Sequence, residues 1–213
     1  MTIKHHLEED TLLAYAAGNL PEAFNLVVAA HISLCDSCRA VVESYDTLGG
    51  ALIEDADTAQ MHQDSLARTL AQLDETPVDR PAPAVETGVL PRPVRDYLGG
   101  DLEAVRWRPI GMGVKQAILS TSNSASARLL LIPAGVAIPD HSHEGREMTL
   151  VLQGAFQDAD DRFARGDVEV ADGSVSHTPV ADIGEDCICL AVTDAPLKFK
   201  GLLPRIVQKF ARI

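Results

Sequence analysis

Apolar residues in the first 75 positions recur at helical spacing and predict short amphipathic helices. Within residues 22–34, for example, Phe24, Val27, Val28 and His31 share one stripe. The predicted helices cover residues 8–17, 22–34, 38–54 and 64–73. Helices this short bury little apolar surface by themselves, and domains of this size often need a metal to hold them together.

A proline-rich segment follows these helices. Residues 76–93 read TPVDRPAPAVETGVLPRP, with five prolines that oppose regular helix and favour extended polyproline II. We therefore expect a domain boundary here, with a semi-rigid linker over residues 76–100.

After Trp107 the pattern changes to short alternating or wholly apolar runs. The predicted strands cover residues 115–120, 128–132, 148–153, 167–170 and 187–192. Turn residues separate them at intervals of about ten, which is typical of a β-sandwich or β-barrel. The expected fold class is therefore multidomain: a small helical domain at 1–75, the linker, and an all-β domain at 101–196. The tail at 197–213 has five basic and no acidic residues. We expect its apolar face to pack on its own domain; a basic amphipathic helix is the alternative.

Charge is distributed unevenly along the 213 residues, whose net charge is −13. Residues 1–85 hold four Lys/Arg against fourteen Asp/Glu, a net charge of −10. This acidity argues against direct nucleic-acid binding and favours a basic partner, although solubility alone is an alternative reason for it. The chain has no apolar run of membrane-spanning length and no signal-peptide pattern at its N-terminus. We expect a cytoplasmic protein that does not contact a membrane.

Two cysteines near the N-terminus carry the first candidate chemistry. His31, Cys35 and Cys38 form H-x3-C-x2-C, and on a helix ending in a short turn they share one face. With an imidazole from His5 or His6, the set has the two thiols and two imidazoles of a closed tetrahedral zinc site. The alternatives are a redox dithiol or two ordinary buried cysteines.

A second ligand pattern lies in the strand half of the chain. His141 and His143 are two apart, so on a strand they point to the same side. Glu147 precedes the apolar strand MTLVLQ, and His177 comes from a later strand. Three imidazoles and a carboxylate suit zinc, iron, nickel or manganese, and the sequence does not choose between them.

The second half resembles the cupins. The first cupin motif is reproduced at every fixed position as Gly135-x5-His141-x-His143-x3-Glu147-x6-Gly154. The second motif is weaker: Gly166 and His177 fit, whereas Asp172, Ser174 and Ala181 depart from it. The resemblance implies a cupin β-barrel with His141, His143, Glu147 and His177 around zinc or another divalent transition metal.

The first half resembles the zinc-binding anti-sigma factors, in which an upstream histidine precedes H-x3-C-x2-C. Carried over, the zinc ligands are His6, His31, Cys35 and Cys38, with His5 competing for the upstream position. The two domains occur together, in this order, in ChrR-type anti-sigma factors, which the chain resembles over essentially its whole length. The resemblance implies a 1:1 complex with an extracytoplasmic-function sigma factor of the sigma-E type, and a role in the singlet-oxygen or photo-oxidative response.

The expected mechanism is occlusion of the sigma factor by the helical domain, with release controlled by the cupin half. The candidate trigger is the cupin metal shell, and the pair Cys187 and Cys189 is the alternative. Cys187 and Cys189 share one side of the strand CICLAV, and we interpret them as packing residues rather than reactive thiols. The alternative function is a cupin dioxygenase or isomerase with a regulatory zinc appendage. Against it, we see no substrate-orienting arginine or tyrosine cluster beyond Arg146.

Overall fold

The helices precede the strands along the chain. The computed structural model describes residues 2–75, 88–159, 161–173 and 176–199. The helices are α1 (Glu9–Ala16), α2 (Glu22–Leu34), α3 (Asp36–Glu54), α4 (Ser65–Glu75) and α5 (Arg92–Leu98), followed by a short 3-10 turn, Leu102–Ala104. The strands are β1 (Arg108–Gly111), β2 (Val114–Leu119), β3 (Ser126–Ile132), β4 (His141–His143), β5 (Glu147–Gln153), β6 (Ala155–Gln157), β7 (Arg162–Ala164), β8 (Val168–Ala171), β9 (Ser176–His177), β10 (Val180–Ala181), β11 (Cys187–Thr193) and β12 (Leu197–Phe199).

A six-stranded antiparallel sheet forms one wall of the barrel. Its strand order is β1-β2-β3-β11-β5-β8. Two three-stranded sheets, β10-β6-β7 and β12-β4-β9, form the opposite side. In the second of these, β4 and β9 pair with His141 directly opposite His177. The architecture is the cupin-like barrel that the sequence predicts.

Both faces of the large sheet are buried, and apolar residues dominate its central strands. Along β11, Ile188, Leu190 and Val192 belong to the core shared with the helices, whereas Cys187 and Cys189 belong to the core inside the barrel. The other central strands, β3 and β5, alternate in the same way. Because successive side chains point to opposite faces of a strand, a wholly apolar run is what a strand buried on both sides requires.

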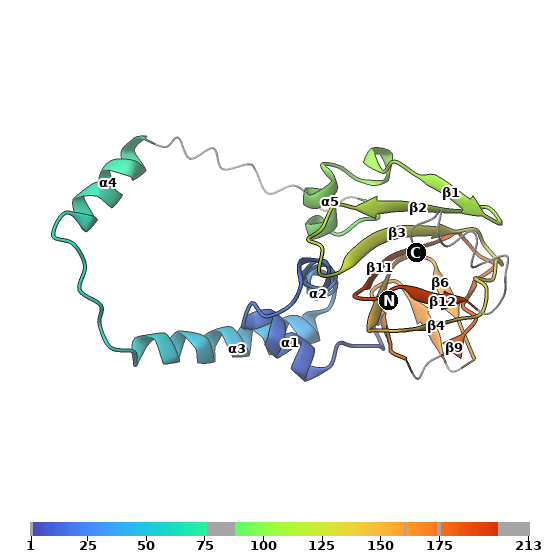
Figure 1. Cartoon of the computed structure of the whole chain (residues 1–213), viewed down its shortest axis with the longest axis horizontal. Coiled ribbons are helices and arrows are strands. Elements are labelled where there is room, and N and C mark those ends of the chain that lie inside the picture. Colours follow the sequence, from blue (N-terminus) through green and yellow to red (C-terminus); the bar gives the residue numbers. More distant parts are fainter. Residues whose placement is uncertain (1, 76–87, 160, 174–175, 200–213) are drawn as a thin grey trace.

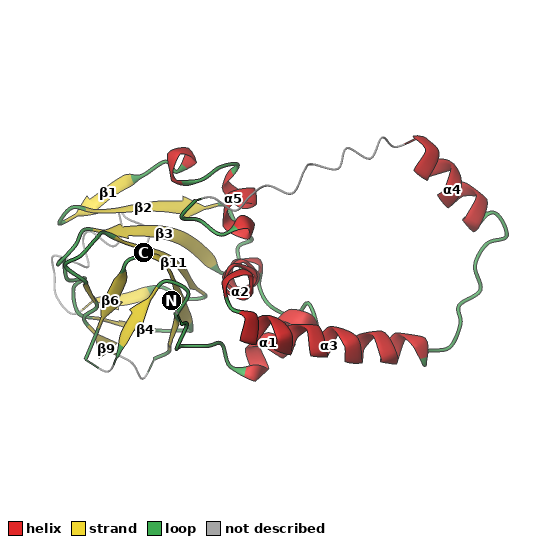
Figure 2. Cartoon of the chain, turned by 180° about the vertical axis from the view of Figure 1, so that it is seen from behind, coloured by secondary structure: helices red, strands yellow, loops and turns green. Residues whose placement is uncertain are grey.

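Helix α2 covers the outer face of this sheet. It packs against β3, β5 and β11, and α1, α3 and α5 lie around it (Figures 1 and 2). At its start, the Glu22 carboxylate accepts hydrogen bonds from the Tyr97 hydroxyl at 2.8 Å and from the backbone N–H of Ser122 at 2.6 Å. The helical half and the barrel therefore share one hydrophobic core.

The predicted elements agree closely with those of the structure, but the linker is shorter than expected. The predicted bounds of the first four helices and the five strands are reproduced to within about two residues. Residues 88–100, assigned to the linker from the sequence, instead include α5 and pack against the shared core through Leu90 and Val94. Pro93 is tolerated because it lies in the first turn of α5, where its missing N–H has no helical partner to lose. Residues 76–87 and the tail beyond 199 lie outside the described residues.

Among the described residues, we find no single helix that has both the length and the apolar character needed to cross a membrane. Helices α2 and α3 meet those criteria only when taken together, and they are bent by 115° relative to each other.

The shared core leads to a test of cooperativity. Val27 of α2 is fully buried, and the single tryptophan, Trp107, packs against the same core from the other half of the chain. We expect Val27→Ala to lower the free energy of unfolding by about 2 kcal/mol. The same shift should appear in urea unfolding followed by Trp107 fluorescence. Ile183→Ala, at a side chain 91% exposed, should leave the transition unchanged. A Trp107 transition that does not respond to Val27→Ala would show that the two halves unfold independently.

Candidate metal centres

The N-terminal cluster forms where α2 ends and α3 begins. Cys35 is extended, with φ −113° and ψ 104°, and separates the two helices. Its Sγ accepts the backbone N–H of Cys38 at 3.5 Å, which caps the first turn of α3. His31 lies one turn before Cys35 on α2, so the three side chains meet on one side of the break.

His31 is held in a form suited to metal binding. Its Nδ1 lies 2.9 Å from the carbonyl oxygen of Gly166, which can only accept, so Nδ1 carries the proton. Burial is the main cause that lowers the pKa of His31 to about 4, so the ring is neutral at physiological pH. Its Nε2 is buried and has no hydrogen-bond partner among the described residues. A metal ion would satisfy this atom.

The N-terminal arm, residues 3–7, brings His6 to the cluster and turns His5 away. The Nδ1 of His6 lies 3.3 Å from the Sγ of Cys35 and 3.6 Å from the Sγ of Cys38. His5 Nε2 instead pairs with Asp161 at 2.8 Å, and its ring packs against Phe163. Of the two histidines that the sequence offers, the structure places His6 with the thiols.

The donor set suits a tetrahedral metal. One donor atom each from His6, His31, Cys35 and Cys38 lies within 4.8 Å of the other three. Burial is the main cause that raises the pKa of Cys38 to about 11, and the neighbouring Cys35 raises it further. Two thiols this close, without metal, therefore favour the protonated form, whereas a bound cation would stabilise the thiolates. The cluster could bind zinc.

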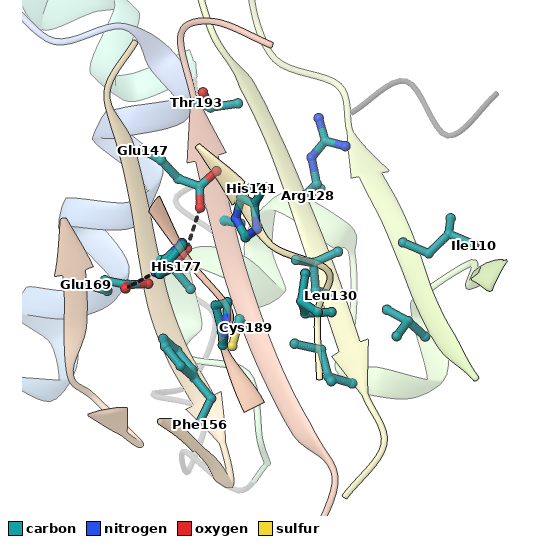
Figure 3. Close-up of a pocket in the computed structure, with 16 residues that line it drawn as sticks. Ile110, Arg128, Leu130, His141, Glu147, Phe156, Glu169, His177, Cys189 and Thr193 are labelled. Atoms are coloured by element: carbon teal, nitrogen blue, oxygen red, sulfur yellow. Dashed lines mark hydrogen bonds and ion pairs between the residues drawn. The ribbon is translucent and has the colours of Figure 1, made fainter. Parts of the chain in front are cut away.

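Three members of the predicted cupin ligand set face a cavity of about 90 Å³ inside the barrel. His141, Glu147 and His177 line this cavity (Figure 3). The rings of His141 and His177 lie 4.7 Å apart because β4 and β9 pair at these residues. His143 belongs to β4, but its side chain lies outside the described residues. The three described members of the predicted set thus share one cavity.

Two carboxylates that the sequence analysis missed lie beside His177. His177 Nδ1 is 2.8 Å from Glu169 (Figure 3) and 3.4 Å from Asp158. Donor atoms of the three residues lie within 4.8 Å of one another. Glu169 interrupts the apolar pattern of the buried strand VEVA. A charged residue at an inward-facing position was the sequence signal that could have identified it. Asp158 follows β6 in a loop and gave no such signal.

Burial and mutual electrostatic interactions shift the pKa values of the titratable groups in the cavity. Burial and then the charge of Glu169 raise the pKa of Glu147 to about 7, and burial likewise raises the pKa of Glu169. Burial is the largest single cause and acts to lower the pKa of His177, but the hydrogen bonds and negative charges of Glu169, Asp158 and Glu147 together outweigh it, and the pKa is raised. A divalent cation would relieve this excess of buried negative charge.

The arginine of the cavity is Arg128, not Arg146. Arg128 is buried in the wall and donates to Gln116 Oε1 at 3.2 Å (Figure 3). Arg146 lies outside the barrel, where it donates to Thr11 Oγ1 at 2.7 Å. The sequence analysis considered Arg146 because it adjoins Glu147, but alternation along the chain turns the two side chains in different directions.

Cys187 and Cys189 lie inside the barrel. Their Sγ atoms are 3.5 Å apart and both residues are buried. Hydrogen bonding to Cys187, followed by burial, raises the pKa of Cys189 well above its ordinary value. This environment disfavours a reactive thiolate and suits the packing role.

Comparison with known proteins gives a consistent answer over the whole chain. Residues 97–196 match the family model described as the ChrR cupin-like domain. The chain is 56% identical over 214 residues to the anti-sigma-E factor ChrR of Cereibacter sphaeroides, with 100% of both chains covered. It is also similar to the anti-sigma ChrR solved in complex with SigE from Rhodobacter sphaeroides, with a TM-score of 0.81 and 53% identity over 91% of this chain and 100% of that chain. This protein therefore belongs to the ChrR family of anti-sigma factors.

Proposed function

We propose that this cytoplasmic protein inhibits an extracytoplasmic-function sigma factor of the sigma-E type by binding it 1:1 through its helical half. The cupin half, in this proposal, controls release. The observation that carries the proposal is an exposed apolar stripe on α3 and α4. We call this the helical stripe, and it consists of Leu48, Leu52, Ile53, Leu66, Leu70 and Leu73.

The helical stripe has the spacing of a binding face. Leu66, Leu70 and Leu73 follow one another at i, i+4 and i+7 along α4, and they are 70%, 52% and 65% exposed. Helix α4 and the end of α3 stand away from the barrel (Figure 1). A row of large apolar side chains in water is costly, and a partner groove that covers such a row is a common mode of helix recognition.

The negative charge around the helical stripe favours a basic partner. Residues 36–73, which carry the stripe, hold seven Asp/Glu and two Arg. An acidic surface with an apolar centre complements a basic protein, and sigma factors present basic DNA-binding surfaces. The similar chain of known structure is an anti-sigma factor in complex with SigE. Occupying such surfaces would keep the sigma factor from DNA.

Zinc bound by His6, His31, Cys35 and Cys38 is the proposed staple of the sigma-binding half. When bound, it would supply four bonds that join three separate segments: the N-terminal arm, the end of α2 and the start of α3. The direction of α3 away from the barrel depends on the break at Cys35. Binding energy of the metal would therefore act as folding energy for the sigma-binding surface.

A divalent transition metal in the cupin cavity is the proposed sensor element, held by His141, His143, Glu147 and His177. Such a metal would neutralise the buried carboxylates beside it. Imidazoles are oxidisable, so singlet oxygen or a related oxidant would remove ligands and loosen the barrel. Because α2 packs on the sheet that carries Glu147, loosening there would reach the helical half.

The first prediction concerns the helical stripe. Leu66→Asp and Leu70→Asp should each raise the dissociation constant for the sigma factor about thirtyfold, because each removes a buried anchor worth about 2 kcal/mol. Ile183→Asp, at an apolar side chain of the barrel that is also exposed, should change it less than about twofold. Isothermal titration with a purified sigma-E-type factor measures all three. Equal affinities for all variants would reject this surface as the interface.

The second prediction concerns the N-terminal metal. Cys38→Ser should remove one metal equivalent and abolish sigma binding, as should chelation of the wild-type protein, because the arm and α3 lose their common anchor. Cys187→Ser is the matched control and should keep the metal and the affinity. Elemental analysis combined with a sigma pull-down provides the measurement. Full binding by the metal-free protein would contradict a structural role for zinc.

The third prediction concerns release. His141→Ala removes a proposed ligand in advance, as the oxidant would, so this variant should dissociate from the sigma factor in the dark about as readily as the illuminated wild type. Singlet oxygen generated by an illuminated photosensitiser should then add little further dissociation. His62→Ala controls for oxidation of an exposed histidine, since this side chain lies on the loop between α3 and α4. Size-exclusion chromatography of dark and illuminated complexes gives the surviving fraction. If His141→Ala complexes matched the wild type both in the dark and under illumination, the cupin cavity would not be the sensor.

A further inference from the structure

The turn between β7 and β8, residues 165–167, belongs to the cupin half but contacts the N-terminal cluster. The carbonyl oxygen of Gly166 accepts the Nδ1 proton of His31 at 2.9 Å, and this bond is buried. It leaves the lone pair of His31 on Nε2, the buried atom without a partner among the described residues. An outer hydrogen bond of this kind fixes both the tautomer and the orientation of a metal-binding histidine.

The next residue of the turn, Asp167, fastens the N-terminal arm. Its Oδ1 accepts the backbone N–H groups of Lys4 at 2.7 Å and of His5 at 3.0 Å. Its Oδ2 accepts the N–H of Ala164 at 2.8 Å, so the carboxylate is also tied to its own turn. The carboxylate is buried, and His6 directly follows the residues it holds. The position of His6 beside the thiols therefore depends on Asp167.

Glycine at position 166 permits the close approach of the arm. Gly166 has φ +91°, a conformation that other residues rarely adopt. A Cβ placed there would also come within 2.7 Å of the Cδ1 of Ile3. Only this residue type lets the arm lie against the turn while the carbonyl faces His31.

The same turn leads directly to the cupin cavity. Strand β8 begins at Val168, whose N–H donates to the His5 carbonyl at 3.3 Å, and continues to Glu169. The Glu169 carboxylate is 2.8 Å from His177. Glu169, which contacts the proposed cupin ligand His177, is therefore only three residues from Gly166, which contacts the N-terminal cluster.

We infer that Gly166 and Asp167 are positioning residues of the N-terminal metal cluster, so that the cupin half sets the affinity of that cluster for metal. This inference rests on the metal site proposed above and adds to it the residues that orient two of the four ligands. It also identifies the β7–β8 turn as the physical link between the two metal centres.

Cobalt titration of the full chain tests the inference. Co²⁺ bound by thiolates gives a charge-transfer absorption, and Cys38→Ser identifies the part of the signal that belongs to the N-terminal cluster. Asp167→Ala removes the acceptor of the Lys4 and His5 backbone N–H groups. It should therefore raise the dissociation constant of this signal at least tenfold, because the arm that carries His6 loses its attachment. Asp161→Ala is the matched control, because the only contact that this carboxylate makes with the arm, among the described residues, is to the His5 side chain; its constant should stay within about twofold. An unchanged constant for Asp167→Ala would overturn the inference.

A measurement on the wild-type protein does not depend on how the variants fold. If the turn orients the ligands, metal in the cluster must in return hold the turn, since coupling is reciprocal. Amide hydrogen exchange at Lys4, His5 and Val168 should slow when Co²⁺ is added to the wild type and should not slow in Cys38→Ser. Equal exchange with and without Co²⁺ in the wild type would overturn the inference.

The two experiments separate this inference from the proposal on which it rests. Absence of a thiolate–cobalt signal in the wild type would reject the N-terminal metal site itself, and the inference with it. A normal signal whose dissociation constant is the same in the wild type and in the Asp167 variant would be consistent with the metal site and would reject only the positioning role of the turn.

Discussion

The constraint on which this structure depends is a β-sheet that must be buried on both faces and whose outer face is apolar. One face closes over the inside of the barrel, and the other would lie in water if the barrel stood alone. Ile188, Leu190 and Val192 lie on that second face, among the most deeply buried residues of the chain. Burial of such residues is the dominant favourable contribution to the free energy of folding, so the sheet needs a helical layer that covers this face. Helix α2 meets it, and the helical half is therefore part of the fold of the barrel.

The N-terminal cluster lies at the edge of this contact. His31 comes from the helix that covers the sheet, and its outer hydrogen bond goes to a turn of the barrel. His6 comes from an arm that the same turn fastens. A metal at this position would hold the segments of the helical half together. Through the hydrogen-bond partners of its ligands, it would also tie that half to the barrel. Two halves that look like separate domains in the sequence thus meet at one chemical centre.

The covered and uncovered parts of the helical half have different roles. The apolar residues of helix α2 are buried against the sheet, whereas those at the end of α3 and on α4 are exposed. The first surface anchors the half to the barrel and the second is free for a partner. Since the break at Cys35 sets the direction in which α3 leaves the sheet, anchoring, metal binding and partner binding depend on a few residues between the two helices.

The sequence by itself determined the type and order of the first four helices and of strands β2, β3, β5, β8 and β11, because helical and strand periodicities are local properties of the chain. Helix α5 and the short strands, which carry too little local pattern, were not predicted from it. It also identified most of the candidate ligands, because His31, Cys35 and Cys38 are neighbours on one helix–turn–helix segment and the cupin motif is a spaced local pattern. Only the tertiary structure decided between His5 and His6, whose directions depend on Asp167 from a distant turn. The same holds for Asp158 and Glu169 beside His177, and for Arg128 in place of Arg146. The linker was overestimated for the same reason: proline content reports on local stiffness, whereas packing of Leu90 and Val94 on a distant core decides where the chain is held.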